Sequence, residues 1–374
     1  MIDAAERMHS ATTLLLEPVA GCAWSDTLWS MRLTGWRPEG PLPVGVSLAG
    51  DGMQGCLHRE ALLAWAAALR AAGDLFLAET VSRTLTAHEA PPTRLAWPGG
   101  ALDLSRPRVM GIINVTPDSF SGDGLHHRLE AAVAQGLRMA AEGADILDVG
   151  GESSRPGAEP VGCEEELQRV VPVVQRLVQV VGLPISVDTR KPEVMEAALD
   201  AGASWINDVT ALREVGAGSF MSRVLAGRAA PIVLMHMQGR PATMQQAPHY
   251  GDLLAEVYGF LAERVAWCVA HGIARSRLIL DPGIGFGKSP AHNLQLLRHL
   301  RVFRGLGLPL LLGVSRKRLV GTLTGEESAE RREVGSHVLA ALGVLNGAQI
   351  LRVHDVAGAR QAVAVAHGWA HGVP

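Results

Sequence analysis

The segment that decides the fold reads PISVDTRKPEVMEAALDAGASWINDV and covers residues 184–209. It opens on a short apolar run, PISVDT, and ends on a second one, WINDV. Between them, residues 192–202 space their apolar side chains as a helix does, starting at a proline and stopping at a glycine. Short runs that are apolar almost throughout are typical of strands covered on both faces of a parallel sheet. The segment therefore predicts a strand–helix–strand unit.

The same alternation continues from residue 105 to the end of the chain. Intervening helical stretches such as residues 129–143 and 253–272 end in glycine, which commonly stops a helix. The strand candidates are residues 108–115, 145–151, 184–189, 205–209, 231–237, 278–283, 308–314 and 349–354. A doubly wound open sheet usually has fewer strands and a glycine fingerprint after the first. We therefore expect an α/β protein with a (β/α)8 TIM barrel.

Residues 1–95 differ in texture and are expected to form an N-terminal extension of uncertain fold, either a small α/β module or a helical module. Residues 59–85 have apolar positions at helical spacing and predict one amphipathic helix. Residues 88–100 combine paired prolines with glycines, which predicts a linker without regular structure. We therefore place the barrel domain at residues 96–374.

The composition limits the class of protein. Hydrophobic residues make up 48% of the 374 and charged residues 19%, which predicts a sizeable core. The net charge of −3 argues against a nucleic acid or an anionic membrane as partner. No apolar run approaches the ~18 residues of a membrane helix, and residues 1–10 lack the apolar core of a secretory signal. The four cysteines lack metal-ligand spacing, which favours free thiols in a reducing compartment. We expect a cytoplasmic protein.

Polar residues stand at the end of every predicted strand, where a TIM barrel carries its chemistry. A single polar residue there is equally well a helix cap or a satisfied core side chain, but one at every strand end indicates a site. Asp148 and Asp208 are interpreted as structural partners for loop backbone. The residues at these ends are Asn114, Asp148, Asp188, Asn207, Asp208, His236, Asp281, Ser315 to Lys317, Arg352 and His354.

The stretch DPGIGFGKS, residues 281–289, superficially resembles a Walker phosphate loop. In that motif the first glycine would fall on Pro282, which has neither the free N–H nor the backbone freedom that the phosphate cradle requires. A helix starting at Lys288 is not expected either, because Pro290 follows. We therefore predict that the glycines let the backbone pass close to a flat ligand, that Phe286 lies against it, and that Asp281 binds it.

The residue types at the strand ends indicate the kind of ligand. Asp188, Asn207 and Asp281 offer acceptors that suit a flat heterocycle with an amidine-like edge, since a carboxylate can accept two parallel N–H bonds. Lys317 would donate to a carbonyl oxygen or ring nitrogen on the opposite edge. An anion-binding set is formed by Arg155, Arg352, His354 and, through a metal, Asn114. Together they predict an aromatic amidine-like ring with a charged leaving group.

The motifs from about residue 106 to 370 resemble, in their order, those of dihydropteroate synthase. They are MGIINVTPDSFSGDG, DILDVGGESSRPGA, ISVDTRKPEV, INDV, LMHMQGRPATMQ, LDPGIGFGKS, GVSRKRLVG and RVHDV. The resemblance implies condensation of 6-hydroxymethyl-7,8-dihydropterin diphosphate with 4-aminobenzoate, which releases pyrophosphate in folate biosynthesis. Sulfonamides compete with 4-aminobenzoate in this family. It also implies Mg2+ and a homodimer through barrel helices remote from the site. Residues 330–349 carry small and apolar residues along one face of a predicted helix, which would suit a dimer interface. Burial of that face against the barrel explains the pattern equally well.

The resemblance also assigns residues to each part of the reaction. It implies that Asp188, Asn207, Met235, Asp281 and Lys317 bind the pterin ring. The diphosphate would meet Asn114, Arg155, Arg352 and His354, with Asn114 as the metal ligand. The 4-aminobenzoate slot would be formed by Ser154, Arg155, Pro156, Phe286 and Arg318. Catalysis would depend on Asp188, Lys317, Arg352 and Asn114. The family favours a path in which pyrophosphate leaves before the amine attacks, so stabilisation of charge matters more than a strong base.

Three departures from the family pattern and two rival functions accompany this assignment. Residues 121–124 reorder a common motif, Ser154 replaces a usual threonine, and Arg318 replaces a frequent serine. Arg318 either binds the carboxylate of 4-aminobenzoate or narrows its slot. A methyltetrahydrofolate-binding methyltransferase shares the fold and the pterin pocket but would not need ESSRPG, SRK and RVHDV together. A catalytically inactive partner subunit would have lost anion or loop residues, and none is missing.

Overall fold

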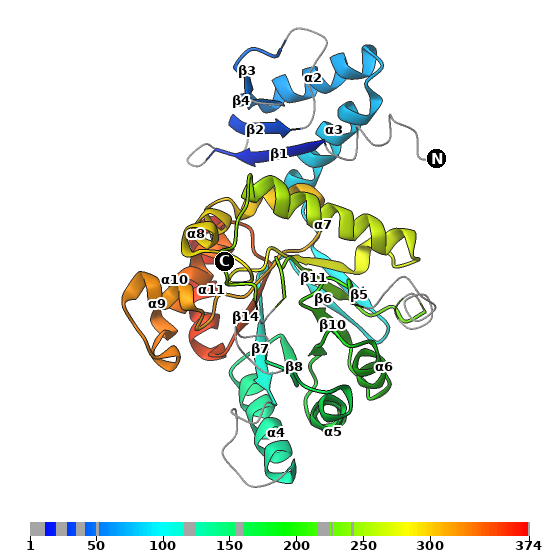
Figure 1. The fold of residues 1–374 in the computed structure, drawn as a ribbon, viewed down its shortest axis with the longest axis vertical. Coiled ribbons are helices and arrows are strands. Elements are labelled where there is room, and N and C mark those ends of the chain that lie inside the picture. The colour runs from blue at the N-terminus through cyan, green and yellow to red at the C-terminus, as the bar shows by residue number, and fades with distance from the viewer. Residues whose placement is uncertain are drawn as a thin grey trace. The chain divides into compact units, whose positions relative to one another are not determined.

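The computed structural model describes residues 12–19, 28–34, 42–49, 52–115, 125–153, 160–214, 225, 227–240 and 243–372, with the side chains of 125–128 excepted. The chain divides into two compact units (Figure 1). One unit comprises residues 1–91, 251–259 and 299–308. The other comprises residues 92–250, 260–298 and 309–374.

The second unit contains an eight-stranded parallel sheet that is nearly closed as a barrel. The sheet order is β12-β11-β10-β9-β8-β7-β14-β13, and a parallel bridge from Leu280 to Leu310 links its two edges. The strands are β7 Arg108–Asn114, β8 Ile146–Gly150, β9 Ile185–Asp188, β10 Trp205–Asp208, β11 Ile232–Met235, β12 Leu278–Asp281, β13 Leu311–Leu312 and β14 Ile350–Val353. Each strand lies within one of the eight predicted runs. The predicted TIM barrel is confirmed.

Helices cover the outside of these strands (Figure 1). They are α4 Leu125–Ala141, α5 Cys163–Val180, α6 Pro192–Asp200, α7 Leu253–Ala270, α8 Pro290–Arg298, α9 Arg318–Thr324, α10 Glu333–Leu345 and α11 Val356–His371, with 3-10 turns η4 Arg275–Arg277 and η6 Ala329–Arg331. Helix α6 starts with Pro192 in its first turn, where the missing N–H costs nothing. None of the helices in the described ranges is long and apolar enough to cross a membrane.

A β-hairpin stands where the sequence predicted an irregular linker. Strand β5 (Arg94–Trp97) pairs with β6 (Gly100–Asp103) in antiparallel register, and Gly99 takes a φ of 87° in the turn. The prolines and glycines therefore shape a tight turn rather than abolish structure. Leu95 and Leu102 join a buried cluster with residues from the barrel strands, including Trp205. The hairpin thus adds apolar side chains to the interior of the barrel.

The first unit is an antiparallel sheet with two helices. Its strands are β1 Thr13–Pro18, β2 Leu28–Thr34, β3 Val46–Ala49 and β4 Gly52–His58, in the order β1-β2-β4-β3. The single helix predicted over residues 59–85 is wrong, because α2 (Arg59–Ala71) stops before Gly73 and α3 (Leu75–Glu89) starts after it. Gly73 has a φ of 88°, and the Asp74 side chain caps α3 by accepting from the Leu77 amide.

Two later segments of the chain belong to this first unit. The 3-10 turn η5 (Leu300–Leu306) contributes Arg304, whose guanidinium donates to the His88 carbonyl at 2.9 Å. His299 pairs with Glu17 of β1 at 2.7 Å. Arg32 of β2 forms an ion pair with Asp252 at 2.8 Å. The extension is therefore folded together with chain that comes after the barrel strand β11.

Candidate active site

Four strand ends of the barrel meet in one hydrogen-bonded network. Arg352, on β14, donates from Nε to Asp148 at 2.6 Å and from a terminal nitrogen to Asp188 at 2.8 Å. The amide nitrogen of Asn207, on β10, donates to the same Asp148 oxygen at 3.0 Å. The structure thus brings together one predicted anion-binding residue and two predicted ring-binding residues. The two sets share one centre.

Burial sets the charge balance of this centre. Burial raises the pKa of Asp188, and Arg352 opposes part of that rise. Burial alone would lower the pKa of Arg352, but Asp148 and Asp188 raise it above its ordinary value. Arg352 therefore remains a fixed positive charge at neutral pH.

Asp148 differs from its sequence interpretation. It was expected to support loop backbone, but its side chain, fully buried on β8, accepts from Arg352 and Asn207 instead. Asp208 does serve the backbone, since it accepts from the amides of Thr210 and Leu212, each at 2.7 Å. The sequence could not separate the two aspartates, because both follow apolar strands. Asp148 is a residue of the site.

The loop after β12 has the backbone conformation predicted from its glycines. Gly283, Gly285 and Gly287 have φ values of 70°, 86° and 65°. A Cβ at Gly283 would lie 1.9 Å from the His236 carbonyl oxygen, which excludes any larger residue. Asp281 is buried and accepts from the Gly283 amide at 2.7 Å. Burial raises its pKa, while Lys317 and this amide favour its charged form.

Lys288 is a structural residue of this loop. Its side chain is 2% exposed, and its ammonium lies 2.9 Å from His236 Nδ1 and 3.0 Å from the Phe286 carbonyl oxygen. Burial lowers the pKa of Lys288 to about 7 and that of His236 to about 2. As expected, no helix starts at Lys288; α8 starts at Pro290, where proline is favoured. The ammonium serves protein acceptors, as a Walker lysine does not.

Lys317 follows strand β13, and its side chain reaches the loop after β12. Its Nζ is 4.7 Å from the centre of the Phe286 ring and donates to the Ile284 carbonyl. Burial lowers the pKa of Lys317 to about 8, and Asp281 opposes this. Phe286 also packs on an apolar cluster that contains Met235. Lys317, Phe286, Met235 and Asp281 therefore combine an apolar wall with opposite charges.

The loops after β13 and β14 are joined by Ser315 and His354. The His354 amide donates to the Ser315 hydroxyl at 3.2 Å, and the same hydroxyl lies 3.0 Å from His354 Nδ1. Arg318 is exposed at the start of α9. Ser154, Arg155 and Pro156 lie outside the described residues.

Asn114 ends β7 beside Asp188. A Cβ built at Gly150, between their strands, would lie 3.9 Å from Asn114 Oδ1 and 3.8 Å from Asp188 Oδ2. Both oxygens therefore lie near the backbone of Gly150. Oxygen ligands are the donors that Mg2+ prefers, and it usually takes only one or two from the protein in addition to substrate phosphates.

An ion-pair network that the sequence did not reveal lies after β8 and β9. Glu152 accepts from Arg190 at 3.1 Å and from Lys191 at 2.9 Å, and Lys191 also pairs with buried Glu166. Arg190 further pairs with Glu214 at 2.5 Å. The only signal in the sequence was that Glu152, Arg190 and Lys191 closely follow strand ends.

Comparison with known proteins identifies the family. A family model described as pterin binding enzyme matches residues 110–354. Dihydropteroate synthase of Escherichia coli strain K12 is 50% identical over 258 residues, which cover 69% of this chain and 90% of that protein. This chain belongs to the dihydropteroate synthase family. The matched region carries the barrel and its strand ends.

Solved structures of dihydropteroate synthases have the same fold. The enzyme of Xanthomonas albilineans with 4-aminobenzoic acid is 54% identical, with a TM-score of 0.70, over 75% of this chain and 99% of that chain. The same enzyme in complex with 7,8-dihydropteroate gives 52% identity and a TM-score of 0.67, over 75% of this chain and all of the other.

Proposed function

We propose that this barrel condenses 6-hydroxymethyl-7,8-dihydropterin diphosphate with 4-aminobenzoate and releases pyrophosphate, as a step of folate biosynthesis. The observation that carries the proposal is the meeting of Asp148, Asp188, Asn207 and Arg352 at one end of a barrel of the dihydropteroate synthase family. Such a centre binds a ring rich in N–H donors next to a fixed cation. The related enzymes solved with 4-aminobenzoic acid and 7,8-dihydropteroate support the same substrates.

The pterin would lie between the strand-end acceptors and the apolar wall. Asp281 and the Asn207 carbonyl would accept its N–H groups, while Lys317 would donate to its carbonyl oxygen or ring nitrogen. Met235 and Phe286 would contact the ring faces, as their shared apolar cluster permits. Asp188 would accept from the ring on the side that faces Arg352.

The departing diphosphate would be stabilised by fixed charge. Arg352 keeps its proton because it pairs with both Asp148 and Asp188, and the His354 ring contacts the Ser315 hydroxyl. These groups favour the bond-breaking transition state by electrostatic preorganisation, and the aniline nitrogen is already a nucleophile. No strong base is required. Arg155 would complete this anion site.

A Mg2+ ion would be held by the Asn114 side-chain oxygen and the substrate diphosphate, because oxygen atoms are the ligands that Mg2+ prefers. When bound, the ion would neutralise charge that develops on the leaving pyrophosphate. The side-chain oxygen of Asn114 would orient the diphosphate by holding the ion to which the diphosphate binds. The 4-aminobenzoate would lie against Phe286, with Ser154, Arg155, Pro156 and Arg318 around it.

A coupled assay with both substrates, with and without Mg2+, tests the proposal. We expect turnover that needs Mg2+ and that a sulfonamide inhibits in competition with 4-aminobenzoate. Methyl transfer from methyltetrahydrofolate without condensation would favour the methyltransferase. Pterin binding without any turnover would favour an inactive partner subunit.

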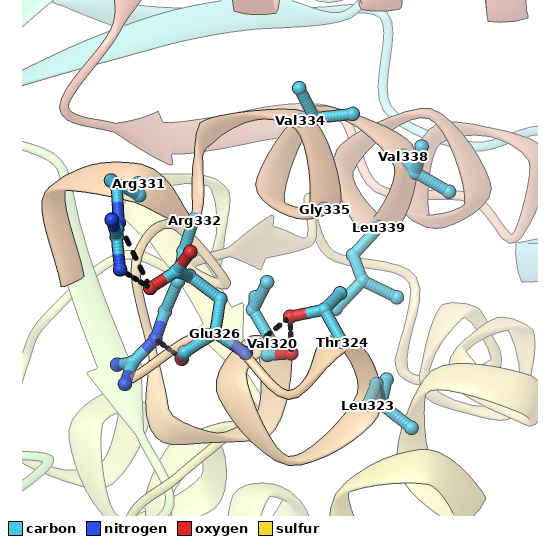
Figure 2. A pocket seen from close by; sticks show the side chains of 10 residues that line it. All are labelled: Val320, Leu323, Thr324, Glu326, Arg331, Arg332, Val334, Gly335, Val338 and Leu339. Atoms are coloured by element: carbon cyan, nitrogen blue, oxygen red, sulfur yellow. Dashed lines mark hydrogen bonds and ion pairs between the residues drawn. The ribbon is translucent and has the colours of Figure 1, made fainter. Parts of the chain in front are cut away.

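The exposed stripe of α10 supports a homodimer. Ser336, Leu339, Ala340 and Gly343 are buried, whereas Val334, Val338 and Leu342 are 77%, 54% and 47% exposed. Burial against the barrel therefore explains one stripe of the helix and not the other. The exposed stripe borders a groove between α9 and α10 of about 480 Å³ (Figure 2). A second copy of the chain would cover it.

Sedimentation at micromolar concentration tests this assembly. We expect a dimer for the unmodified chain and a monomer for Val338→Glu. A monomeric unmodified chain would refute it. The first turn of the same helix contacts the loop that carries Lys317, since Ser336 accepts from the Arg316 amide.

A further inference from the structure

The loop that carries Lys317 adopts a backbone conformation that its own residues disfavour. Arg316 has a φ of 59°, in the left-handed region that non-glycine residues seldom enter. Such a conformation persists only where the surroundings over-determine it. Arg316 directly precedes Lys317, so its backbone sets the direction from which that side chain departs.

Residues at the start of α10 supply the missing constraint. The Arg316 amide donates to the Ser336 hydroxyl at 2.9 Å, and the Arg332 guanidinium donates to the Arg316 carbonyl at 3.1 Å. The Arg316 side chain donates to Glu333 Oε1 at 2.6 Å. Both peptide groups and the side chain of one residue are therefore bound by one helical turn.

Two of these residues, Ser336 and Arg332, are themselves held in place. Ser336 is buried and its hydroxyl donates to the Arg332 carbonyl at 2.6 Å. Arg332 also donates from Nε to the Glu326 carbonyl at 2.9 Å, as Figure 2 shows. Gly321 of α9 leaves room for this guanidinium, since a Cβ there would lie 2.8 Å from two of its nitrogens.

We propose that Arg332, Glu333 and Ser336, together called the α10 clamp, are positioning residues for Lys317. The clamp locks Arg316 in its left-handed conformation and so directs the Lys317 ammonium over Phe286 and toward Asp281. The role rests on the proposed function, in which Lys317 binds the pterin. None of the three residues touches the substrate in this scheme.

The conformation of Arg316 explains why the clamp acts on binding. If the clamp is broken, Arg316 relaxes to an ordinary negative φ and the following peptide turns. Lys317 is the N-cap residue of α9 but its side chain makes no capping hydrogen bond, so the helix end does not fix its direction. Its ammonium must then be reoriented at each binding event, which weakens binding of the ring.

A double-mutant cycle tests the clamp. Ser336→Ala removes the hydroxyl that accepts from the Arg316 amide, and Glu333→Gln removes the charge that pairs with the Arg316 guanidinium. Both change the side-chain volume little, and Glu330→Gln serves as the matched control on an exposed carboxylate. Binding of a pterin analogue is measured by calorimetry, with thermal melts alongside. We expect about tenfold weaker binding for either clamp variant, as loss of one buried hydrogen bond allows. The clamp variants should keep nearly the same KM for 4-aminobenzoate. The control variant should keep nearly the same melting temperature and pterin affinity.

The same substitutions on a Lys317→Ala background give the decisive comparison. If the clamp acts through the lysine, Ser336→Ala should change pterin affinity by less than about twofold there. An equal loss on both backgrounds would overturn the proposal, as would unchanged affinity in the single variants. If Ser336→Ala fails to fold, Glu333→Gln carries the same test.

Failure of the clamp and failure of the proposed function give different results. If Lys317→Ala keeps full pterin affinity, the clamp has no lysine to position and is rejected, while turnover still supports the reaction. If the unmodified chain binds the analogue but does not turn over, the reaction is rejected. In that case the double-mutant cycle still tests the clamp, because it measures only the affinity for the pterin analogue.

Discussion

The loops after β12 and β13 present a lysine at the same end of the barrel, and they reach their conformations by opposite means. The loop after β12 turns on three glycines, which adopt the left-handed conformation without steric penalty. The loop after β13 turns on left-handed Arg316, which α10 must hold. One conformation is encoded locally, and the other comes from a helix that follows later in the chain.

The two lysines differ in the same way. Lys288 is buried and bonds to the His236 ring and to backbone carbonyls, so its hydrogen bonds stabilise the loop itself. Lys317 lies over Phe286, beside Asp281, where a ligand can enter. Burial lowers the pKa of both, so a perturbed pKa does not separate a structural lysine from a binding one. Their partners do.

The largest effect is expected at Asp281, the last residue of β12. Asp281→Ala should abolish useful pterin binding, because loss of one partner of a buried charge-assisted pair costs about 2–5 kcal/mol. Calorimetry with a pterin analogue measures it, with Asp200→Ala as an exposed control. Near-normal affinity would remove Asp281 from the site.

Replacing each lysine with methionine separates the two roles. Lys317→Met should weaken pterin binding by about 1.5–3 kcal/mol, the usual value of a hydrogen bond to a charged group, and barely change the melting temperature. Lys288→Met should lower the melting temperature and leave the affinity of the folded protein nearly unchanged. Comparable losses of affinity in both would revive the phosphate-loop interpretation.

The local encoding of the β12 loop predicts sensitivity to a single methyl group. Gly283→Ala should destabilise the fold by at least about 2 kcal/mol, since it combines a left-handed φ with a clash against the His236 carbonyl. Denaturant unfolding measures the free energy. Gly182→Ala, where a Cβ meets no atom within 4 Å, is the control. Equal stability of the two variants would contradict the argument.

The buried Lys288 predicts a pH dependence. Its pKa is about 7 in the folded chain against 10.5 ordinarily, so between these values the unfolded chain binds a proton that the folded chain lacks. The free energy of unfolding should therefore rise with pH across this window, relative to Lys288→Met. Thermal melts of both proteins at pH 7 and pH 9 measure the difference. A difference independent of pH would mean that the lysine stays protonated when folded.

The smallest effect on stability is expected from Arg316→Gly. Relief of the left-handed strain contributes about 1 kcal/mol, and loss of the ion pair with Glu333 offsets it. The melting temperature should therefore stay nearly constant while pterin affinity falls. A large drop in melting temperature would show that Arg316 acts mainly through its side chain.

The barrel and its strand ends could be predicted from the sequence because both follow from local periodicity. A strand buried on both faces must be short and apolar, and its last residue must point to the C-terminal end of the barrel, so Asn207 and Asp281 could be found by reading strand ends. Local signals were also misread where they were present. Gly73 with Asp74 marks a helix break, and Gly99 marks a hairpin turn rather than a linker.

Only the tertiary structure decided which side chains pair with one another. Asp148 and Arg352 are separated by 204 residues, and no local pattern specifies which aspartate the arginine will meet. The same holds for Lys288 with His236 and for Arg316 with Ser336, since each pair joins segments that are far apart in the sequence. The sequence by itself determined which polar groups reach the end of the barrel, because backbone periodicity places them there. Only folding decided which of them neutralise one another and which remain directed at a ligand, because that choice depends on distances across the barrel.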